Sequence, residues 1–159
     1  MSRRDEITAA SRALLEEEGE EALTMRRLAD RLGIKAPSLY KHVRSRREIE
    51  TLLAAEALRE IGEALGAARD LEEMGRAYRA WALANPALYR IATTRPLDRA
   101  NLPEGVEDAA AAPLIEKVGG DQDRARAAWA LAHGLTLLEL DGRFPDDADV
   151  EGAWRAGLT

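Results

Sequence analysis

Residues 24–46, TMRRLADRLGIKAPSLYKHVRSR, govern the interpretation of the whole chain, because they predict two short helices joined by a tight turn. The Thr24 hydroxyl can accept a hydrogen bond from a free amide of a first turn, so a helix is expected to begin after it. Gly33 is expected to end this helix, since glycine readily adopts the left-handed conformation. The second helix is expected to begin at Pro37, because proline is well tolerated at the first helical position, and to continue through His42.

The same stretch concentrates positive charge. Residues 24–47 contain eight basic residues and one acidic residue, a net charge of +7, whereas the whole chain carries −6. The basic residues are Arg26, Arg27, Arg31, Lys35, Lys41, Arg44, Arg46 and Arg47. A local positive charge that the rest of the chain does not share indicates a polyanionic partner. A helix-turn-helix places its second helix in the major groove of DNA, so duplex DNA is the expected partner.

The N-terminal region resembles the DNA-binding domain of the TetR family of bacterial transcriptional repressors. The resemblance extends from about Ile7 to Leu53. It is carried by Ile7, Ala10, Leu14, Leu15, Gly19, Leu23, Thr24, Met25, Arg26, Leu28, Ala29, Leu32, Gly33, Ile34, Ser38, Leu39, Tyr40, Lys41, His42, Val43, Ser45 and Arg46. Val43 stands where an aromatic residue is common in the family, and Arg46 stands where lysine is usual. Neither departure threatens the fold, and Arg46 can still bind a phosphate.

The resemblance implies two groups of DNA contacts. The residues expected at base edges are Arg26, Lys35, Ala36, Pro37 and Ser38. The residues expected at phosphates, which position a protein rather than specify a sequence, are Thr24, Tyr40, Lys41, His42, Ser45 and Arg46. An arginine can bond guanine through two hydrogen bonds, which discriminates by about 1–3 kcal/mol. The alternative is an ordinary three-helix core with a solvated basic face, in which the Tyr40 ring packs against the first helix.

The composition excludes several classes of function. The chain has 159 residues and no cysteine, so disulfides, thiolate metal sites and thiol catalysis are excluded. Only two histidines are present, and there is no metal-ligand spacing, phosphate-binding glycine loop or nucleophile motif. No apolar run reaches the roughly 18 residues of a membrane span, and the N-terminus lacks the apolar core of a signal peptide. We therefore expect a cytoplasmic protein that is not an enzyme and needs no cofactor or metal.

The remaining sequence predicts an all-α fold of about nine helices. A helix-turn-helix domain is expected over residues 1–45, and a C-terminal helical domain for ligand binding and dimerisation over residues 46–159. The expected helices outside the helix-turn-helix run from Ser2 to Gly19, then over about 46–67, 71–84, 86–93, 103–118 and 121–140, with a short one within 148–158. Ser45 and Glu48 have the spacing of a capping box. Glu16, Glu17 and Glu18 end the first helix, where the helix dipole disfavours them, for no reason visible in the sequence.

The expected helix that ends at Leu140 is apolar around much of its circumference. One face carries Trp129, Ala132, His133, Thr136, Leu137 and Leu140, and a neighbouring face carries Ala128, Leu131, Leu135 and Leu138. Such a helix must be covered on more than one side, which predicts a two-fold dimer with a four-helix interface, as in the TetR family. The predicted interface residues are Ala128, Leu131, Leu135, Leu138 and Trp154. Residues 129–134 also resemble the Trp/His/Gly signature of one C-terminal subgroup of that family.

The resemblance further implies a ligand inside the C-terminal bundle. The polar or aromatic residues on its apolar faces are the candidates, because small molecules bind in apolar sites with a few polar groups. They are Tyr78, Trp81, Tyr89, Thr93, Trp129 and His133. The alternative for each is that it fills the core, and His133 in particular fits a hydrogen-bonded core histidine.

These predictions combine into one hypothesis, a sequence-specific, ligand-responsive homodimeric repressor. Its partners would be a pseudo-palindromic duplex operator and an unidentified small-molecule effector, with no membrane. Two alternatives stay open: a helical protein-interaction module, and a constitutive DNA binder or activator without a ligand pocket.

Overall fold

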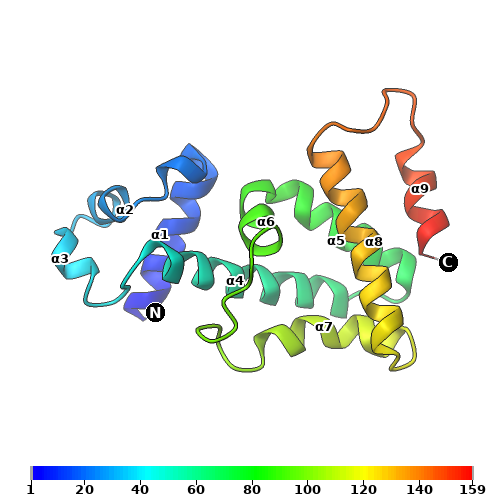
Figure 1. Ribbon diagram of the computed structural model, residues 1–159, viewed down its shortest axis with the longest axis horizontal. Coiled ribbons are helices and arrows are strands. Elements are labelled where there is room, and N and C mark those ends of the chain that lie inside the picture. The colour runs from blue at the N-terminus through cyan, green and yellow to red at the C-terminus, as the bar shows by residue number, and fades with distance from the viewer. Residues whose placement is uncertain (1, 159) are drawn as a thin grey trace. The chain divides into compact units, whose positions relative to one another are not determined.

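The computed structural model describes residues 2–158, and this part of the chain is all helical, as predicted (Figure 1). Its elements, in chain order, are α1 (Arg3–Glu18), the short 3-10 helix η1 (Glu20–Ala22), α2 (Met25–Arg31), α3 (Ala36–Leu39), α4 (Arg46–Gly66), α5 (Leu71–Ala84), α6 (Pro86–Thr93), α7 (Val106–Lys117), α8 (Gln122–Leu140) and α9 (Val150–Gly157). No strand occurs within residues 2–158. The helix boundaries mostly follow the predicted caps and breakers.

The described residues form two compact units that are each discontinuous in sequence. Unit 1 comprises residues 2–57 and 87–104, and unit 2 comprises residues 58–86 and 105–158. Helix α4 contributes its first part to unit 1 and its last part to unit 2. The division into domains at residue 45 stays a prediction. The structural units differ from it chiefly in residues 87–104, which belong with the N-terminal helices.

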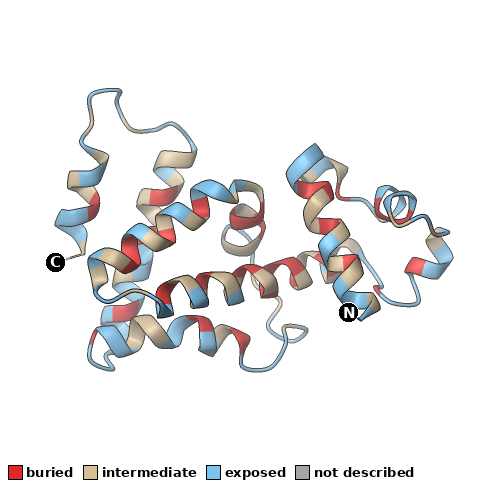
Figure 2. Ribbon diagram, turned by 180° about the vertical axis from the view of Figure 1, so that it is seen from behind, coloured by how far each residue is buried: buried red, intermediate tan, exposed pale blue. Residues whose placement is uncertain are grey.

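Unit 1 has a continuous apolar core. The Ser2 hydroxyl accepts a hydrogen bond from the Asp5 amide at 3.2 Å, and the Asp5 carboxylate accepts one from the Ser2 amide, so α1 begins with a capping box. Its large apolar side chains that are at most 1% exposed are Ile7, Leu14, Leu15, Leu23, Leu28, Leu39, Val43, Ile49, Leu53, Leu88 and Tyr89. Buried residues recur along α4 in Figure 2, which shows that this helix is part of the core rather than a surface element.

The turn between α2 and α3 has the backbone geometry that the sequence predicted. Gly33 has φ +65°, its amide donates to the Asp30 carbonyl at 3.1 Å, and the Ile34 amide donates to the Ala29 carbonyl at 3.0 Å. This pair of bonds is a Schellman motif, which satisfies the last carbonyls of α2. Helix α3 begins at Ala36, one residue before the predicted start.

Helix α3 is only four residues long, shorter than predicted. Pro37 lies in its first turn, where an amide would have no helical acceptor in any case. Beyond Leu39 the backbone continues as a hydrogen-bonded turn, because the amides of His42 and Val43 both donate to the Leu39 carbonyl. The residues predicted to continue the helix, Tyr40 to His42, therefore stay in a regular arrangement.

Unit 2 is a small bundle in which α5, α7, α8 and α9 contact one another. A Cβ placed on Gly75 of α5 would meet Trp154 and Leu158, so α9 lies directly against the backbone of α5. Gly157 likewise contacts the Leu131 side chain of α8. Helix α7 begins at Val106 rather than near residue 103, because Gly105 with φ +74° precedes it.

Candidate functional site

The cations of α2 divide into two groups. Arg31 donates two hydrogen bonds to Glu17, at 2.8 and 2.6 Å, and Arg27 is paired with Glu18. The hydrogen bonds from Arg31 hold the pKa of Glu17 below its ordinary value. The glutamates at the end of α1 therefore neutralise the side of α2 that faces α1. This explains their unfavourable position at that helix end.

The cations on the other side of the helix-turn-helix have no carboxylate partner. Within residues 2–158, no ion pair is formed by Arg26, Lys35, Lys41 or Arg44, and all four residues are exposed. Four of the eight basic residues in residues 24–47 therefore remain available to a polyanion. We call these four residues the open cations.

The predicted base-edge and phosphate residues are mostly accessible. Thr24 caps α2 by accepting a hydrogen bond from the Arg27 amide at 3.2 Å, as predicted. Along α3 and the following turn the exposed residues are Lys35, Pro37, Ser38, Tyr40, Lys41 and His42, whereas Ala36 is half-buried. The Tyr40 residue is 50% exposed, so its ring is not enclosed by the helices of unit 1.

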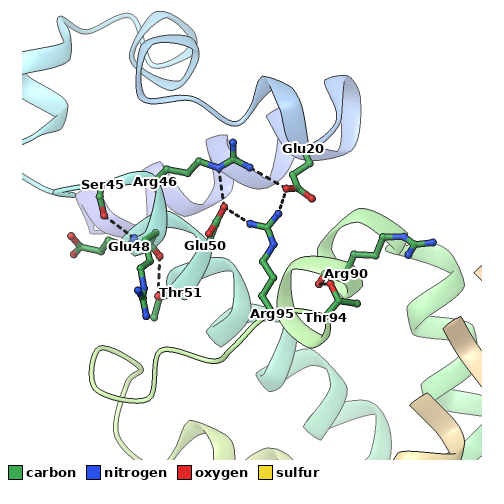
Figure 3. Close-up of polar contacts among 10 residues, drawn as sticks. Glu20, Ser45, Arg46, Glu48, Glu50, Thr51, Arg90, Thr94 and Arg95 are labelled. Atoms are coloured by element: carbon green, nitrogen blue, oxygen red, sulfur yellow. Dashed lines mark hydrogen bonds and ion pairs between the residues drawn. The ribbon is translucent and has the colours of Figure 1, made fainter. Parts of the chain in front are cut away.

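The start of α4 is held by capping and ion pairs. The Ser45 hydroxyl accepts from the Glu48 amide at 3.3 Å, but the Glu48 carboxylate accepts from the amide of Arg44 rather than from that of Ser45. Arg46 donates to Glu50 at 2.8 Å and to Glu20 at 3.2 Å, and the same two carboxylates accept from Arg95 (Figure 3). Arg46 is therefore half-buried and paired, unlike the open cations.

The predicted ligand residues are divided between the two units. In unit 2, Tyr78 is buried, and the indole nitrogen of Trp81 donates to Glu60 at 2.8 Å. The rings of Trp129 and His133 stack with centroids 5.8 Å apart, and burial lowers the pKa of His133. Trp129 is 48% exposed, so much of its ring lies at the surface of unit 2.

The other two ligand candidates lie in unit 1. Tyr89 is fully buried, and the Thr93 hydroxyl donates to its carbonyl at 2.7 Å. Each unit also has a surface cleft. The unit 1 cleft, of about 310 Å³, is lined by Arg47, Glu50, Thr51, Ala54, Ile91, Ala92, Arg95, Pro96, Leu97 and Asp98. The unit 2 cleft, of about 230 Å³, is lined by Glu72, Arg76, Arg79, Glu151, Trp154, Arg155 and Leu158. None of the six candidates lines either cleft.

The predicted interface residues on α8 are largely accessible. Leu131 is 36% exposed and Leu138 is 44% exposed, while Ala128 and Leu135 are half-buried. Trp154, by contrast, is 5% exposed and lies against α5. Its ring is thus part of the core of its own unit, which leaves little of it for a partner.

Arg79 fixes α9 to the rest of unit 2. It donates to Glu139 of α8 at 2.7 and 2.6 Å and is also paired with Glu151 of α9. The hydrogen bonds that Arg79 donates to Glu139 raise the pKa of Arg79 above its ordinary value. Helix α9 is therefore held against both α5 and α8, next to the outer face of α8.

Sequence reasoning missed three features of these sites. Arg44 was not assigned a role, although it is an open cation. The ion-pair cluster around Arg46 was not predicted, since Glu20 and Arg95 are 75 residues apart in the chain. On α8, Ala127, Ala130 and Gly134 also face away from the buried residues, and a Cβ on Gly134 would meet no atom within 4 Å. The spacing of these small residues by three and four was a signal that could have identified this face.

The described residues offer neither a metal-binding cluster nor a membrane-spanning helix. Among residues 2–158, no group of three or more His, Cys, Asp or Glu side chains is arranged to hold a metal ion. No helix in the same range combines the length and apolar character needed to cross a membrane.

The comparison with protein families matches both parts of the chain. The family described as "Bacterial regulatory proteins, tetR family" matches residues 7–49. A second family, described as "Tetracyclin repressor-like, C-terminal domain", matches residues 71–159, a stretch that contains the Trp129, His133 and Gly134 signature.

Individual relatives agree with these families. An uncharacterised HTH-type transcriptional regulator of Mycobacterium tuberculosis is 35% identical over 95% of this chain and 76% of its own length. The class C tetracycline repressor of Escherichia coli is 33% identical over 72% of this chain, which spans about half (49%) of that protein. Among solved structures, a variant of TetR from Acinetobacter baumannii in complex with minocycline has a TM-score of 0.69 at 25% identity, over 99% of this chain and 93% of its own.

Proposed function

This chain belongs to the TetR family of bacterial regulatory proteins, and on that premise we propose that it is a homodimeric repressor released from a pseudo-palindromic operator by a small molecule. Members of the family are DNA-binding transcriptional regulators. The observation that carries the proposal for this chain is the division of charge on α2 and α3. Cations facing α1 are neutralised, and the open cations are not.

The DNA-binding face would consist of the exposed residues of α2, α3 and the start of α4. Residues 35–38 would contact base edges, because they lie on or next to the N-terminal turn of the second helix, α3. Arg26, which is exposed on α2, would contact a base edge beside them. Thr24, Tyr40, Lys41, His42, Ser45 and Arg46 would contact phosphates, and we add Arg44 to this group because of its exposure. The half-buried Ala36 would contribute a close approach of the backbone rather than a long side chain.

The dimer would form through α8 and α9. In support, α8 exposes two leucines, Leu131 and Leu138, beside small residues that allow close approach of a second helix. A two-fold interface repeats each contact, so the same face on both subunits would be buried. Ala128 and Leu135 would lie at the edge of this interface. Trp154 would support it from within the core.

The effector site would involve the aromatic and polar residues of the C-terminal region. In unit 2, the side chains that suit a ligand with a flat apolar body and a few polar groups are Tyr78, Trp81, Trp129 and His133. Tyr89 and Thr93 stay separate candidates within unit 1. Binding of effector and of DNA would oppose each other, as linked equilibria require. The protein would act in the cytoplasm, where the operator is.

One observation favours a second candidate function. Neither surface cleft is lined by the predicted ligand residues, and two of these residues are fully buried or nearly so. Ligand candidates that are buried in this way suit a constitutive DNA binder, which would regulate through its own abundance. Titration of the protein–operator complex with a library of small molecules separates the two candidates, because only the ligand-responsive protein releases its operator.

The central test is selection of duplexes from a random pool by the purified protein, followed by sequencing and affinity measurement across a salt series. We expect enrichment of a pseudo-palindrome and an affinity that falls steeply with salt, since each phosphate contact releases counterions. A pool that shows no enriched sequence would contradict the proposal and favour a protein-interaction module.

A further inference from the structure

Four charged side chains from three elements of unit 1 form a closed cluster. Arg46 and Glu50 belong to α4, Glu20 to η1, and Arg95 follows the end of α6 (Figure 3). The Glu50 Oε1 atom accepts from Arg46 Nε at 2.8 Å and from Arg95 Nη1 at 2.7 Å. The Glu20 Oε1 atom likewise accepts from Arg46 at 3.2 Å and from Arg95. The Oε1 atoms of Glu20 and Glu50 therefore each accept hydrogen bonds from both arginines.

The cluster is electrically neutral, with two cations and two anions. Arg46 cannot bind a phosphate through the same N–H groups that it now gives to Glu20 and Glu50. Each of these N–H groups that turns to a phosphate leaves its carboxylate with one partner fewer. Glu50 has a side chain only 19% exposed, so solvent compensates its charge poorly once a partner leaves. A second cation is needed at the same oxygens, and Arg95 is already bound there.

We propose that Arg95 is a positioning residue for DNA binding, which keeps Glu20 and Glu50 neutralised so that Arg46 is free to contact a phosphate. The inference rests on the proposed function, because it assumes that Arg46 faces DNA. Without Arg95 the remaining three groups carry a net charge of −1. Arg46 is then held by two carboxylates that have no other partner, and its departure would leave both of them uncompensated near the phosphates.

The test uses the full-length protein and a 30-bp duplex of mixed sequence, because phosphate contacts do not depend on the operator. The main variant is Arg95→Gln. The matched control is Arg99→Gln, which removes the same charge from the same loop, four residues further along the chain. Two further variants test the mechanism: Arg95→Lys keeps the charge, and Arg95→Gln combined with Glu50→Gln restores neutrality to the cluster.

We expect Arg95→Gln to weaken binding about tenfold at low salt and to reduce the log–log salt slope by about one per subunit, the signature of one lost phosphate contact. Arg99→Gln should leave the slope unchanged. Arg95→Lys and the Arg95→Gln/Glu50→Gln double variant should recover most of the wild-type affinity. A purely structural role for Arg95 would lower the unfolding temperature without changing the salt slope, and the double variant would not recover.

Each outcome decides the inference. Equal losses for Arg95→Gln and Arg99→Gln, with wild-type slopes, overturn it while leaving DNA binding intact. A wild-type protein that binds no duplex overturns the proposed function itself. Should Arg95→Gln fail to fold, Glu50→Gln alone provides the test. This variant removes one carboxylate that holds Arg46, so it should tighten DNA binding severalfold and keep the salt slope of the wild type. An unchanged affinity would contradict the inference.

Discussion

Arg31 of α2 and Glu17 of α1 form a bidentate ion pair. Its two hydrogen bonds run from Nη1 to Oε2 at 2.8 Å and from Nη2 to Oε1 at 2.6 Å. Arg26, on the same helix, forms no ion pair within residues 2–158 and is exposed. Two arginines that look equivalent in the sequence therefore differ in what they can offer to DNA.

Arg26→Ala should weaken operator binding far more than Arg31→Ala. An arginine at a guanine edge contributes about 1–3 kcal/mol of discrimination, so we expect a loss of roughly 5–150-fold for Arg26→Ala. Arg31 is already paired with Glu17, and its removal should change the affinity by no more than about threefold. Fluorescence anisotropy on the selected operator measures both. Similar losses for the two variants would mean that the pairing with α1 does not distinguish their roles.

Gly33→Ala should destabilise the protein through its backbone alone. Gly33 has φ +65° and open space around it, so the added methyl group meets no neighbour and the cost is the left-handed conformation itself, about 1–2 kcal/mol. Gly33→Asn should cost less, because asparagine tolerates this region better. Urea unfolding measures the free energy of unfolding of both variants. Equal values for the two would show that the left-handed conformation is not the cause of the loss.

Leu138→Lys should dissociate the dimer. Leu138 is 44% exposed on α8, so a lysine is tolerated in the subunit, but a two-fold interface would meet the new charge twice. We expect the dissociation constant to rise about 10–100-fold in sedimentation equilibrium. Leu83→Lys is the control, since Leu83 is 39% exposed on α5 and lies outside the predicted interface. If Leu83→Lys dissociates the dimer and Leu138→Lys does not, the interface lies elsewhere.

Acid should remove a stabilising contribution of Glu73. Arg69 hydrogen-bonds this carboxylate through its side chain and its backbone amide, which lowers the pKa of Glu73 from 4.5 to about 2. A lowered folded-state pKa means that the unfolded state binds the proton first. The contribution is therefore complete above about pH 4.5 and is lost as the pH falls toward 2. Urea unfolding at pH 6 and pH 3 should show the difference between wild type and Glu73→Gln shrinking at the lower pH. A constant difference would show that Arg69 does not favour the ionised form.

Local signals predicted the fold well because they act over a few residues. Thr24 and Gly33 delimit α2 through hydrogen bonds to neighbours in sequence, and both behave as predicted. Helix α3 was predicted less well. The helix ends at Leu39 and a hydrogen-bonded turn follows, a change that the pattern of polar residues after Leu39 does not reveal.

Charge pairing was beyond the reach of the sequence. The glutamates at the end of α1 looked unfavourable until their partners on α2 were known, because pairs such as Arg31 and Glu17 depend on the packing of two helices. Arg95 lies in residues 87–104, which belong to unit 1 although the residues just before them, including α5, belong to unit 2. The same holds for Trp154. Its place in the last helix indicated an interface, but its ring packs against α5 where Gly75 has no side chain.

The return of residues 87–104 to unit 1 has a consequence for how this protein is made. A ribosome releases the helix-turn-helix early, yet the unit to which it belongs stays incomplete until residue 104 has emerged. An excised fragment that ends with α4 would lack Leu88, Tyr89 and Arg95, and with them part of its apolar interior and one of the charges around Glu50. We expect such a fragment to fold poorly on its own, so that nascent chains acquire affinity for DNA only late in synthesis.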